Sequence, residues 1–225
     1  MGPRALRRTM TGPGETAFPV DRARRGPPPR RHEPPEDPTR PRLFYAVPLP
    51  DDVREAIRPV RDAVQASVGD GTARIRWVRI ESLHLTLRFL GPTPLDRADE
   101  LARLGDEAAA ATRPFEIRIA GAGAFPSPAR PRTLWLGLQR GGPELATLAG
   151  TLAAVTGGND DRPFAAHLTL ARTDGLRAGP EAARALAEAA SDREWSFRAD
   201  RIVLFRSHLG AGPAWYEPLH ESPIR

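Results

Sequence analysis

The tetrapeptide His-Leu-Thr-Leu occurs twice in the chain, at residues 84–87 and again at residues 167–170, each time within an apolar run. Side chains of a β-strand alternate between its two faces, so in each copy the His and the Thr share one face and the two Leu share the other. The Leu side chains can then be buried in a core, while an imidazole and a hydroxyl project together from the opposite face. Two such pairs could hold a small anion and exchange protons with it.

A single His in an apolar strand is more often a core histidine whose hydrogen bonds are satisfied. The duplication favours a site instead, in which His84 and His167 act as one acid and one base, because unperturbed imidazole titrates near ~6.5. Thr86 and Thr169 would donate hydrogen bonds to an anionic oxygen, although Thr is also simply common in strands. Because the two motifs are nearly identical, their residues leave open which His is the acid.

The composition excludes several other classes of site. The chain has no Cys, and neither motif His has a carboxylate at the close helical spacing of metallohydrolases, so we expect no metal site and no other cofactor. It also has no Lys, which excludes the glycine-rich phosphate loop that ends in Lys and Ser or Thr. His32, His208 and His220 lie outside the motifs, and we interpret them as incidental.

The elements that would position the motifs occur in the same order twice. In the first half we expect a strand at 43–47, a helix from Asp51, the first motif strand, a helix at 95–111 and a strand at 115–119. One apolar face of the helix from Asp51 is formed by Val53, Ile57, Val60, Val64 and Val68. In the second half we expect a strand at 134–138, a helix whose apolar face holds Leu145, Leu148, Leu152 and Val155, the second motif strand, a helix from about Pro180 and Glu181, a strand at 197–205 and an edge strand at 214–219.

A repeated order of elements is a stronger signal than a repeated short peptide. It predicts an α+β fold with two similar lobes of antiparallel sheet, related by a pseudo-two-fold axis and carrying helices on their outer faces. The two His-x-Thr strands would face each other across a central cleft.

The residues around both motifs resemble the two-histidine (2H) phosphoesterase superfamily, and within it the RNA 2′,3′-cyclic phosphodiesterases, historically called 2′-5′ RNA ligases. The resemblance rests on residues 43–47, 77–91 and 164–172, and it extends over about residues 41–225. One departure is Ala166, which stands where relatives often have Pro. This change should loosen the entry into the second motif strand without removing a reactive group.

The resemblance implies hydrolysis of a 2′,3′-cyclic phosphate at an RNA end to a 2′-phosphate, which together with the expected lack of a metal site makes the reaction metal-independent. His84 would protonate the departing ribose 3′ oxygen, and His167 would activate water. The resemblance also associates Phe89 with the base and Arg172 with the phosphate. The alternation of side chains along a strand disagrees with this. Phe89 and Arg172 each lie five residues after a motif His, and an odd offset places a side chain on the opposite face unless the strand bends, bulges or ends. The alternative is a core Phe and a solvated Arg.

The sequence does not identify the substrate. RNA ends or small cyclic-phosphate nucleotides are the expected partners, with 2′-5′ ligation as a possible reverse reaction. Alternatives are the same chemistry on 2′-5′ oligonucleotides or on a cyclic phosphate of ADP-ribose, and a non-catalytic module that binds RNA ends. Trp77, Tyr45 and Trp135 are candidates either for stacking on a base or for the core.

The charge of the chain is concentrated in its first 40 residues. They contain nine Arg against five acidic residues, whereas residues 41–225 contain 24 Arg against 23 acidic residues. Residues 1–40 are also rich in Pro and poor in apolar residues, which predicts a disordered tail before a 2H phosphoesterase domain at 41–225. The chain has neither a signal-peptide segment nor a run of about 20 apolar residues. We therefore expect a cytoplasmic monomer without a membrane or an obligate protein partner.

Overall fold

The computed structural model describes residues 37, 39–69, 75–157, 163–173, 178–208 and 214–225. Contacts divide the chain into residues 1–35 and a compact unit of residues 36–225, and the fold described here is that of the second unit. The predicted disordered tail at 1–40 and His32 therefore lie almost wholly outside the described residues.

The elements of the compact unit follow one another in this order: β1 (Arg42–Pro48), α1 (Asp51–Val68), β2 (Arg76–Trp77), η2 (Ile80–Ser82), β3 (His84–Pro92), η3 (Leu95–Arg97), α2 (Ala98–Ala110), β4 (Phe115–Phe125), β5 (Thr133–Arg140), α3 (Gly142–Thr156), β6 (Leu168–Arg172), α4 (Ala178–Ala189), β7 (Glu194–Ala199), β8 (Arg201–His208) and β9 (Trp215–Pro223). The elements labelled η are single turns of 3₁₀ helix. The helix expected at 95–111 thus begins as a 3₁₀ turn and becomes α-helical at Ala98.

The described strands form one antiparallel sheet in the order β7-β4-β5-β6-β3-β1-β8-β9, with β2 paired to β6. The two motif strands, β3 and β6, are neighbours at the centre, where Leu85 pairs with Leu168. Four strands lie on each side of this junction in matching positions. The predicted α+β fold with two similar halves around the motif strands is confirmed, as one continuous sheet rather than two separate ones.

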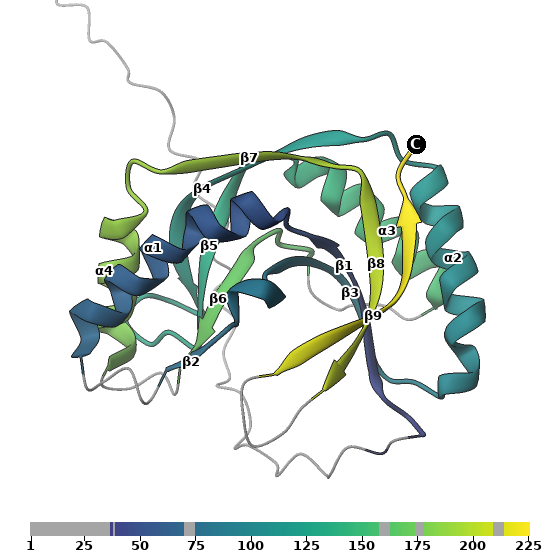
Figure 1. Ribbon diagram of the computed structural model, residues 1–225, viewed down its shortest axis with the longest axis horizontal. Helices are drawn as coiled ribbons and strands as arrows, with labels where there is room; N and C mark the ends of the chain where they lie inside the picture. Colours follow the sequence, from purple (N-terminus) through teal and green to yellow (C-terminus); the bar gives the residue numbers. More distant parts are fainter. Residues whose placement is uncertain (1–36, 38, 70–74, 158–162, 174–177, 209–213) are drawn as a thin grey trace, which may run out of the picture. The chain divides into compact units, whose positions relative to one another are not determined.

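The lobes of the sheet do not coincide with the two halves of the sequence. β4, the last strand of the first copy, pairs with β5 and β7, whereas β8 pairs with β1. The helices are exchanged in the same way, since α1 packs against α4 and α2 packs against α3 (Figure 1). Each lobe is therefore built from both copies of the repeat.

The single strand expected at 197–205 is wrong. β7 ends at Ala199 and β8 begins at Arg201, and β7 is the edge strand at one end of the sheet whereas β8 is next to the edge strand at the other end. Apolar residues alternate in β7 at 195, 197 and 199, but in β8 the buried run begins at Ile202, which is out of phase. The exposed Asp200 between them marks the point where the chain changes lobe.

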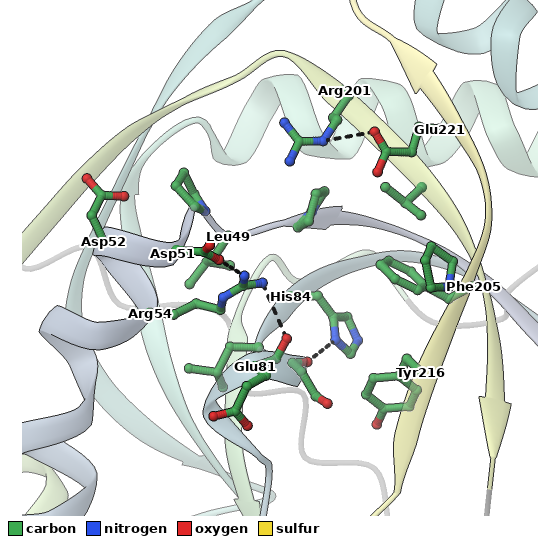
Figure 2. A pocket seen from close by; sticks show the side chains of 16 residues that line it. Leu49, Asp51, Asp52, Arg54, Glu81, His84, Arg201, Phe205, Tyr216 and Glu221 are labelled. Atoms are coloured by element: carbon green, nitrogen blue, oxygen red, sulfur yellow. Dashed lines mark hydrogen bonds and ion pairs between the residues drawn. The ribbon is translucent and has the colours of Figure 1, made fainter.

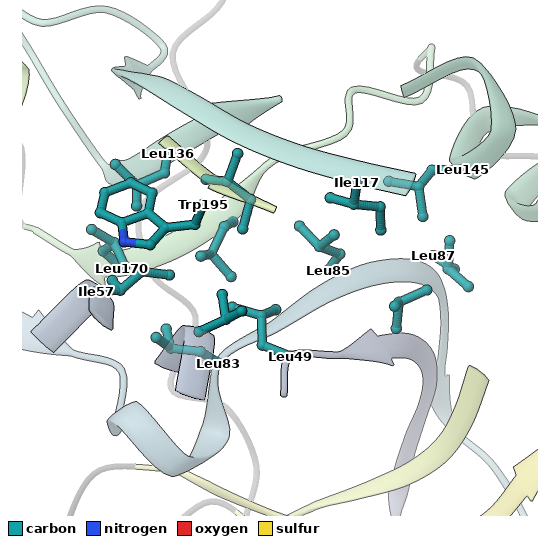
Figure 3. Close-up of a cluster of buried hydrophobic side chains, with 14 of the residues drawn as sticks. Leu49, Ile57, Leu83, Leu85, Leu87, Ile117, Leu136, Leu145, Leu170 and Trp195 are labelled. Atoms are coloured by element: carbon teal, nitrogen blue, oxygen red, sulfur yellow. The ribbon is translucent and has the colours of Figure 1, made fainter. Parts of the chain in front are cut away.

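The core lies on the Leu face of the motif strands. Leu85, Leu87, Leu168 and Leu170 are each at most 4% exposed, and Figure 3 shows motif leucines in one cluster with Ile57 of α1 and Leu145 of α3. All five residues of the predicted apolar face of α1 are buried, as expected. Burial of the leucines against helices fixes which way each motif strand faces, and the His and Thr side chains are left half-buried on the other face.

Alternation in β1 separates two aromatic residues in the same way. Tyr45 is buried and its hydroxyl donates a hydrogen bond of 2.5 Å to the Leu101 carbonyl of α2, so it belongs to the helix-covered face. Its neighbour Phe44 points to the opposite face, where its ring lies 5.0 Å from the His84 ring. Of the aromatic candidates from the sequence, Tyr45 is therefore a core residue.

Trp135 of β5 lies against Gly123 of β4. A Cβ atom added at Gly123 would overlap the indole ring, so only Gly leaves room for the tryptophan there. By contrast, Gly150 on the exposed side of α3 has no heavy atom within 4 Å of the position its Cβ would take.

We expect these two glycines to respond to Ala in opposite ways. Gly123→Ala should lower the free energy of unfolding by about 1–3 kcal/mol through overpacking against Trp135. Gly150→Ala should raise it by roughly 0.5–1 kcal/mol, because Ala favours a helix interior. Urea unfolding of both variants followed by circular dichroism measures this. A Gly123→Ala protein as stable as the unmodified one would contradict the packing described here.

Candidate active site

The junction of β3 and β6 brings the two motifs together. Because Leu85 pairs with Leu168 in antiparallel register, one residue further along each strand His84 lies alongside Thr169 and Thr86 lies alongside His167. The two histidines are then diagonal neighbours, which in antiparallel strands are about 7–8 Å apart between Cα atoms. This arrangement leaves room for one small anion among two imidazoles and two hydroxyls.

Each motif histidine is oriented by a backbone carbonyl two residues earlier. Nδ1 of His84 lies 2.8 Å from the Ser82 oxygen, and Nδ1 of His167 lies 2.7 Å from the Ala165 oxygen. A carbonyl oxygen only accepts hydrogen bonds, so Nδ1 of each ring carries the proton. Nε2 of each neutral ring is then the atom with a lone pair available to a substrate. The sequence analysis did not foresee these contacts, because the backbone direction before a strand has no residue signature.

A β-bulge in β3 explains how Phe89, five residues after His84, reaches the same face of the sheet as that histidine. In the β1–β3 ladder Ala46 lies opposite Thr86 and Tyr45 lies opposite Arg88, so Leu87 has no partner residue in this ladder. Leu87 and Arg88 are consequently buried in succession. The extra residue shifts the alternation by one. Phe89 therefore returns to the histidine face, where it is 61% exposed and its ring lies 5.8 Å from the ring of Phe44.

β6 contains the corresponding bulge. Trp135 lies opposite Thr169 and Leu134 lies opposite Ala171, which leaves Leu170 as the extra residue. Arg172 is thereby turned to the histidine face and is exposed. Burial lowers the pKa of both motif histidines, and the positive charge of Arg172 adds to this effect, so the guanidinium acts on both of them. The equivalent bulges in β3 and β6 therefore place Phe89 and Arg172 on the same face of the sheet as the two motif histidines.

Aromatic rings surround His84. Its ring lies 5.0 Å from Phe44, 6.2 Å from Phe205 of β8, and 5.0 Å from Tyr216 of β9, against which it packs at 88°. The sequence analysis missed these three residues, because the pairing of β8 with β1 and of β9 with β8 is a long-range property. Alternation alone could only have indicated that Phe44 and Tyr45 face opposite ways.

His167 has aromatic neighbours of its own. Phe125, the last residue of β4, packs against its ring at 5.1 Å and 87°, and Trp135 lies 6.4 Å away. Trp135 was a candidate from the sequence, whereas Phe125 was missed. The third candidate, Trp77, is half-buried and packs against the core.

Burial controls the charge of both imidazoles. It lowers the pKa of His84 to about 4, and the positive charges of Arg172 and His167 act in the same direction, while the hydrogen bond to Ser82 opposes them. Burial also lowers the pKa of His167, again with a contribution from Arg172. At pH 7 both rings are therefore neutral in the free protein. A general base is present, whereas a general acid appears only when an anion raises one of these pKa values.

A pocket of about 640 Å³ opens beside His84 and does not include His167 among its lining residues. Figure 2 shows the His84 ring next to Tyr216 and Phe205, with charged side chains around the rest of the pocket. Arg201 contacts Glu221 and Arg54 contacts Asp51, so both cations of the pocket are paired. The charged lining residues are Asp51, Asp52, Glu81, Glu221, Arg54 and Arg201. With four carboxylates against two guanidiniums, the pocket repels a phosphate and suits groups that donate hydrogen bonds.

The two remaining described histidines bind carboxylates away from the motifs. His208 lies 2.8 Å from Glu217 and stacks on Trp215, and His220 lies 2.8 Å from Asp106 of α2. Within the described residues, His, Asp and Glu form no group of three or more that could hold a metal ion. No helix in this part of the chain is long and apolar enough to cross a membrane.

Comparisons with known proteins agree with this arrangement. A family model described as the 2′-5′ RNA ligase superfamily matches residues 49–211. The RNA 2′,3′-cyclic phosphodiesterase of Archaeoglobus fulgidus is 36% identical over 146 residues, which cover 63% of this chain and 77% of that protein. The crystal structure of a Thermus thermophilus protein superposes with a TM-score of 0.65 at 26% identity, over 82% of this chain and 98% of that one. Escherichia coli LigT in complex with 3′-AMP superposes with a TM-score of 0.60 at 26% identity over the same shares.

The geometry predicts the ionisation of both histidines in the free protein. In ¹H–¹⁵N NMR spectra at pH 7, His84 and His167 should both be neutral with the proton on Nδ1, and His84 should titrate near pH 4 because of its burial. Spectra of His84→Ala and His167→Ala assign the signals. Titration of His84 near ~6.5, the value of a solvated imidazole, would contradict the burial described here.

Proposed function

Because the chain belongs to the 2′-5′ RNA ligase superfamily, we propose that it hydrolyses 2′,3′-cyclic phosphate ends of RNA to 2′-phosphates without a metal ion. The observation that supports this most is the pair of imidazoles on adjacent strands, each held through Nδ1 with Nε2 left for proton transfer. Relatives named RNA 2′,3′-cyclic phosphodiesterases, including that of Archaeoglobus fulgidus, support the choice of substrate.

In the proposed mechanism His167 is the base and His84 is the acid. Nε2 of His167 takes a proton from water, whose oxygen forms a bond to phosphorus. On the opposite side the bond from phosphorus to the ribose 3′ oxygen breaks, and Nε2 of His84 gives that oxygen a proton. The assignment of the two roles follows the family resemblance, and each role contributes on the order of 10²–10⁴-fold to the rate.

Thr86, Thr169 and Arg172 bind the phosphate in this proposal. The two hydroxyls lie alongside the histidines in the register of β3 and β6, so they can donate to the non-bridging oxygens. Arg172 supplies the positive charge that the otherwise apolar surroundings lack. Because charge accumulates on those oxygens during attack, these donors stabilise the transition state more than the ground state.

In this proposal, binding of the substrate makes His84 a general acid by favouring its protonated form. His84 is neutral in the free protein because burial and the nearby charge of Arg172 lower its pKa to about 4. A phosphate anion at hydrogen-bonding distance raises an imidazole pKa by about 1–3. Protonation of His84 is therefore coupled to binding of the cyclic phosphate.

Phe89 is the proposed platform for the terminal base, since it is exposed on the histidine face next to Phe44. A 2′-5′ oligonucleotide or a cyclic phosphate of ADP-ribose would use the same two histidines. A module that only binds RNA ends would need donors but not two imidazoles with free Nε2 atoms, so the paired histidines favour an enzyme.

We expect His84→Ala and His167→Ala each to lower kcat by about 10²–10⁴-fold. The assay is hydrolysis of a short RNA ending in a 2′,3′-cyclic phosphate, in excess EDTA, with the position of the product phosphate determined by ³¹P NMR. The matched control is His220→Ala, because His220 pairs with Asp106 and lies outside the motifs. Full turnover in either motif variant, or loss of turnover in EDTA, would contradict the proposal.

The lowered histidine pKa values also predict how the rate depends on pH. kcat/KM reports the free enzyme, in which both pKa values lie below that of solvated imidazole, so it should be greatest below pH ~6.5 and fall as the acid loses its proton. kcat reports the complex, in which the bound anion raises the pKa of His84, so its optimum should lie at higher pH. Steady-state rates between pH 4 and pH 9 test this difference. Identical optima would argue against coupling of protonation to binding.

A further inference from the structure

Arg88 is the charged residue that the bulge of β3 turns inward. It is 7% exposed, and no other Asp, Glu or Arg in the described ranges is buried. Taking a guanidinium out of water is unfavourable unless hydrogen bonds and nearby charges compensate for it. The position of Arg88 in the fold therefore depends on a compensating contact.

That contact is with the end of α3. Nη2 of Arg88 donates a hydrogen bond of 3.0 Å to the carbonyl oxygen of Gly157, which follows the last residue of the helix. The last carbonyls of a helix have no partners within it and form the negative end of its dipole, so a cation is stabilised there. The last turn of α3 has no basic residue of its own. Arg88 thus supplies from β3 the positive charge that this helix end lacks.

Without the bulge, β3 would have a pattern that suits the polarity of its side chains better. Regular alternation from His84 would put Arg88 on the histidine face, in contact with water, and Phe89 in the core. The bulge does the reverse, because it buries the guanidinium and leaves the Phe89 ring 61% exposed. Hydrophobic burial alone therefore favours the register without the bulge.

β6 shows the opposite relation between bulge and polarity. Its bulge at Leu170 turns Ala171 inward, where it is 0% exposed, and turns Arg172 outward. Without that bulge Arg172 would enter the core, so the polarity of the side chains already favours the bulged form. Of the bulges that follow the two motifs, only that of β3 opposes the polarity of its residues and needs a specific contact to hold it.

We propose that Arg88 is a positioning residue for Phe89. By binding the end of α3 it selects the bulged form of β3, and this keeps the Phe89 ring on the histidine face. α3 is a firm anchor, because Leu145, Leu148 and Leu152 are fully buried in the core. In the function proposed above Phe89 stacks on the terminal base, and the role of Arg88 in substrate binding rests on that function.

The first test follows the Phe89 ring itself. With 4-fluorophenylalanine at position 89, the change of the ¹⁹F chemical shift between H₂O and D₂O reports contact of the ring with water. This change should be largely lost in Arg88→Met and in the shorter Arg88→Gln, because neither side chain can donate to Gly157 and the ring then enters the core. Arg88→Lys should retain it, since an ammonium group can donate to the same carbonyl. Both Met and Gln variants should remain folded, because the register without the bulge buries Phe89 instead.

The matched control is Arg97→Met. Arg97 lines the same small cavity as Arg88, but it is exposed and pairs with Glu100. Its removal should leave the ¹⁹F shift unchanged.

The second test is selectivity for a substrate that carries a base. It compares kcat/KM for adenosine 2′,3′-cyclic phosphate with kcat/KM for methyl ribofuranoside 2,3-cyclic phosphate, which lacks the base. Arg88→Met should lower the ratio of the two values at least about fivefold, through KM, which is the lower end of the effect of losing one stacked base. Phe89→Ala should lower it equally, and the double variant should lower it no further. Arg88→Lys and Arg97→Met should keep the ratio.

Three results would overturn the role of Arg88. They are an unchanged ¹⁹F shift in the folded Met or Gln variant, an equal loss of kcat/KM for both substrates, and failure of both variants to fold, which would mean that Arg88 is needed for the fold and not for the choice of register. If the unmodified protein hydrolysed neither substrate, the proposed function would be contradicted, whereas the ¹⁹F shift would still decide whether Arg88 positions the Phe89 ring.

Discussion

The site depends on how β3 and β6 meet. Leu85 and Leu168 form the pair that connects the two central strands, and both are buried on the side covered by helices. The hydrophobic effect therefore fixes the face and the register of each motif strand at once, because a slip by one residue would expose Leu and bury His. The positions of the polar groups are a consequence of apolar packing on the other side of the sheet.

The same packing explains why the histidines are neutral. Aromatic rings from strands distant in sequence surround His84, and its exposure to water is reduced although the residue faces the site. Arg172 adds a positive charge that disfavours protonation of either ring. Among the described residues, the free protein therefore places the guanidinium of Arg172 near two uncharged imidazoles, a combination that attracts an anion.

The sequence predicted the parts of this arrangement that depend on local periodicity. The motif strands, the apolar face of α1 and the opposite faces of Leu and His all follow from alternation or helical spacing, and the structure agrees. The place of Phe89 and Arg172 could not be derived, because a bulge at Leu87 or Leu170 depends on the neighbouring strand. Phe205, Tyr216 and Phe125 were missed for a related reason, since strand order is set by tertiary packing.

The exchange of strands between the lobes has a consequence for folding during synthesis. Until β8 has left the ribosome, one edge of β1 has no partner and the lobe that surrounds His84 lacks two of its strands. The other lobe cannot be completed by the first half of the chain either, because both strands that pair with β4, β5 and β7, come from the second half. Contacts between distant residues thus dominate the last step of folding, and the aromatic surroundings of His84 are complete only when β8 and β9, the last two strands, have been made.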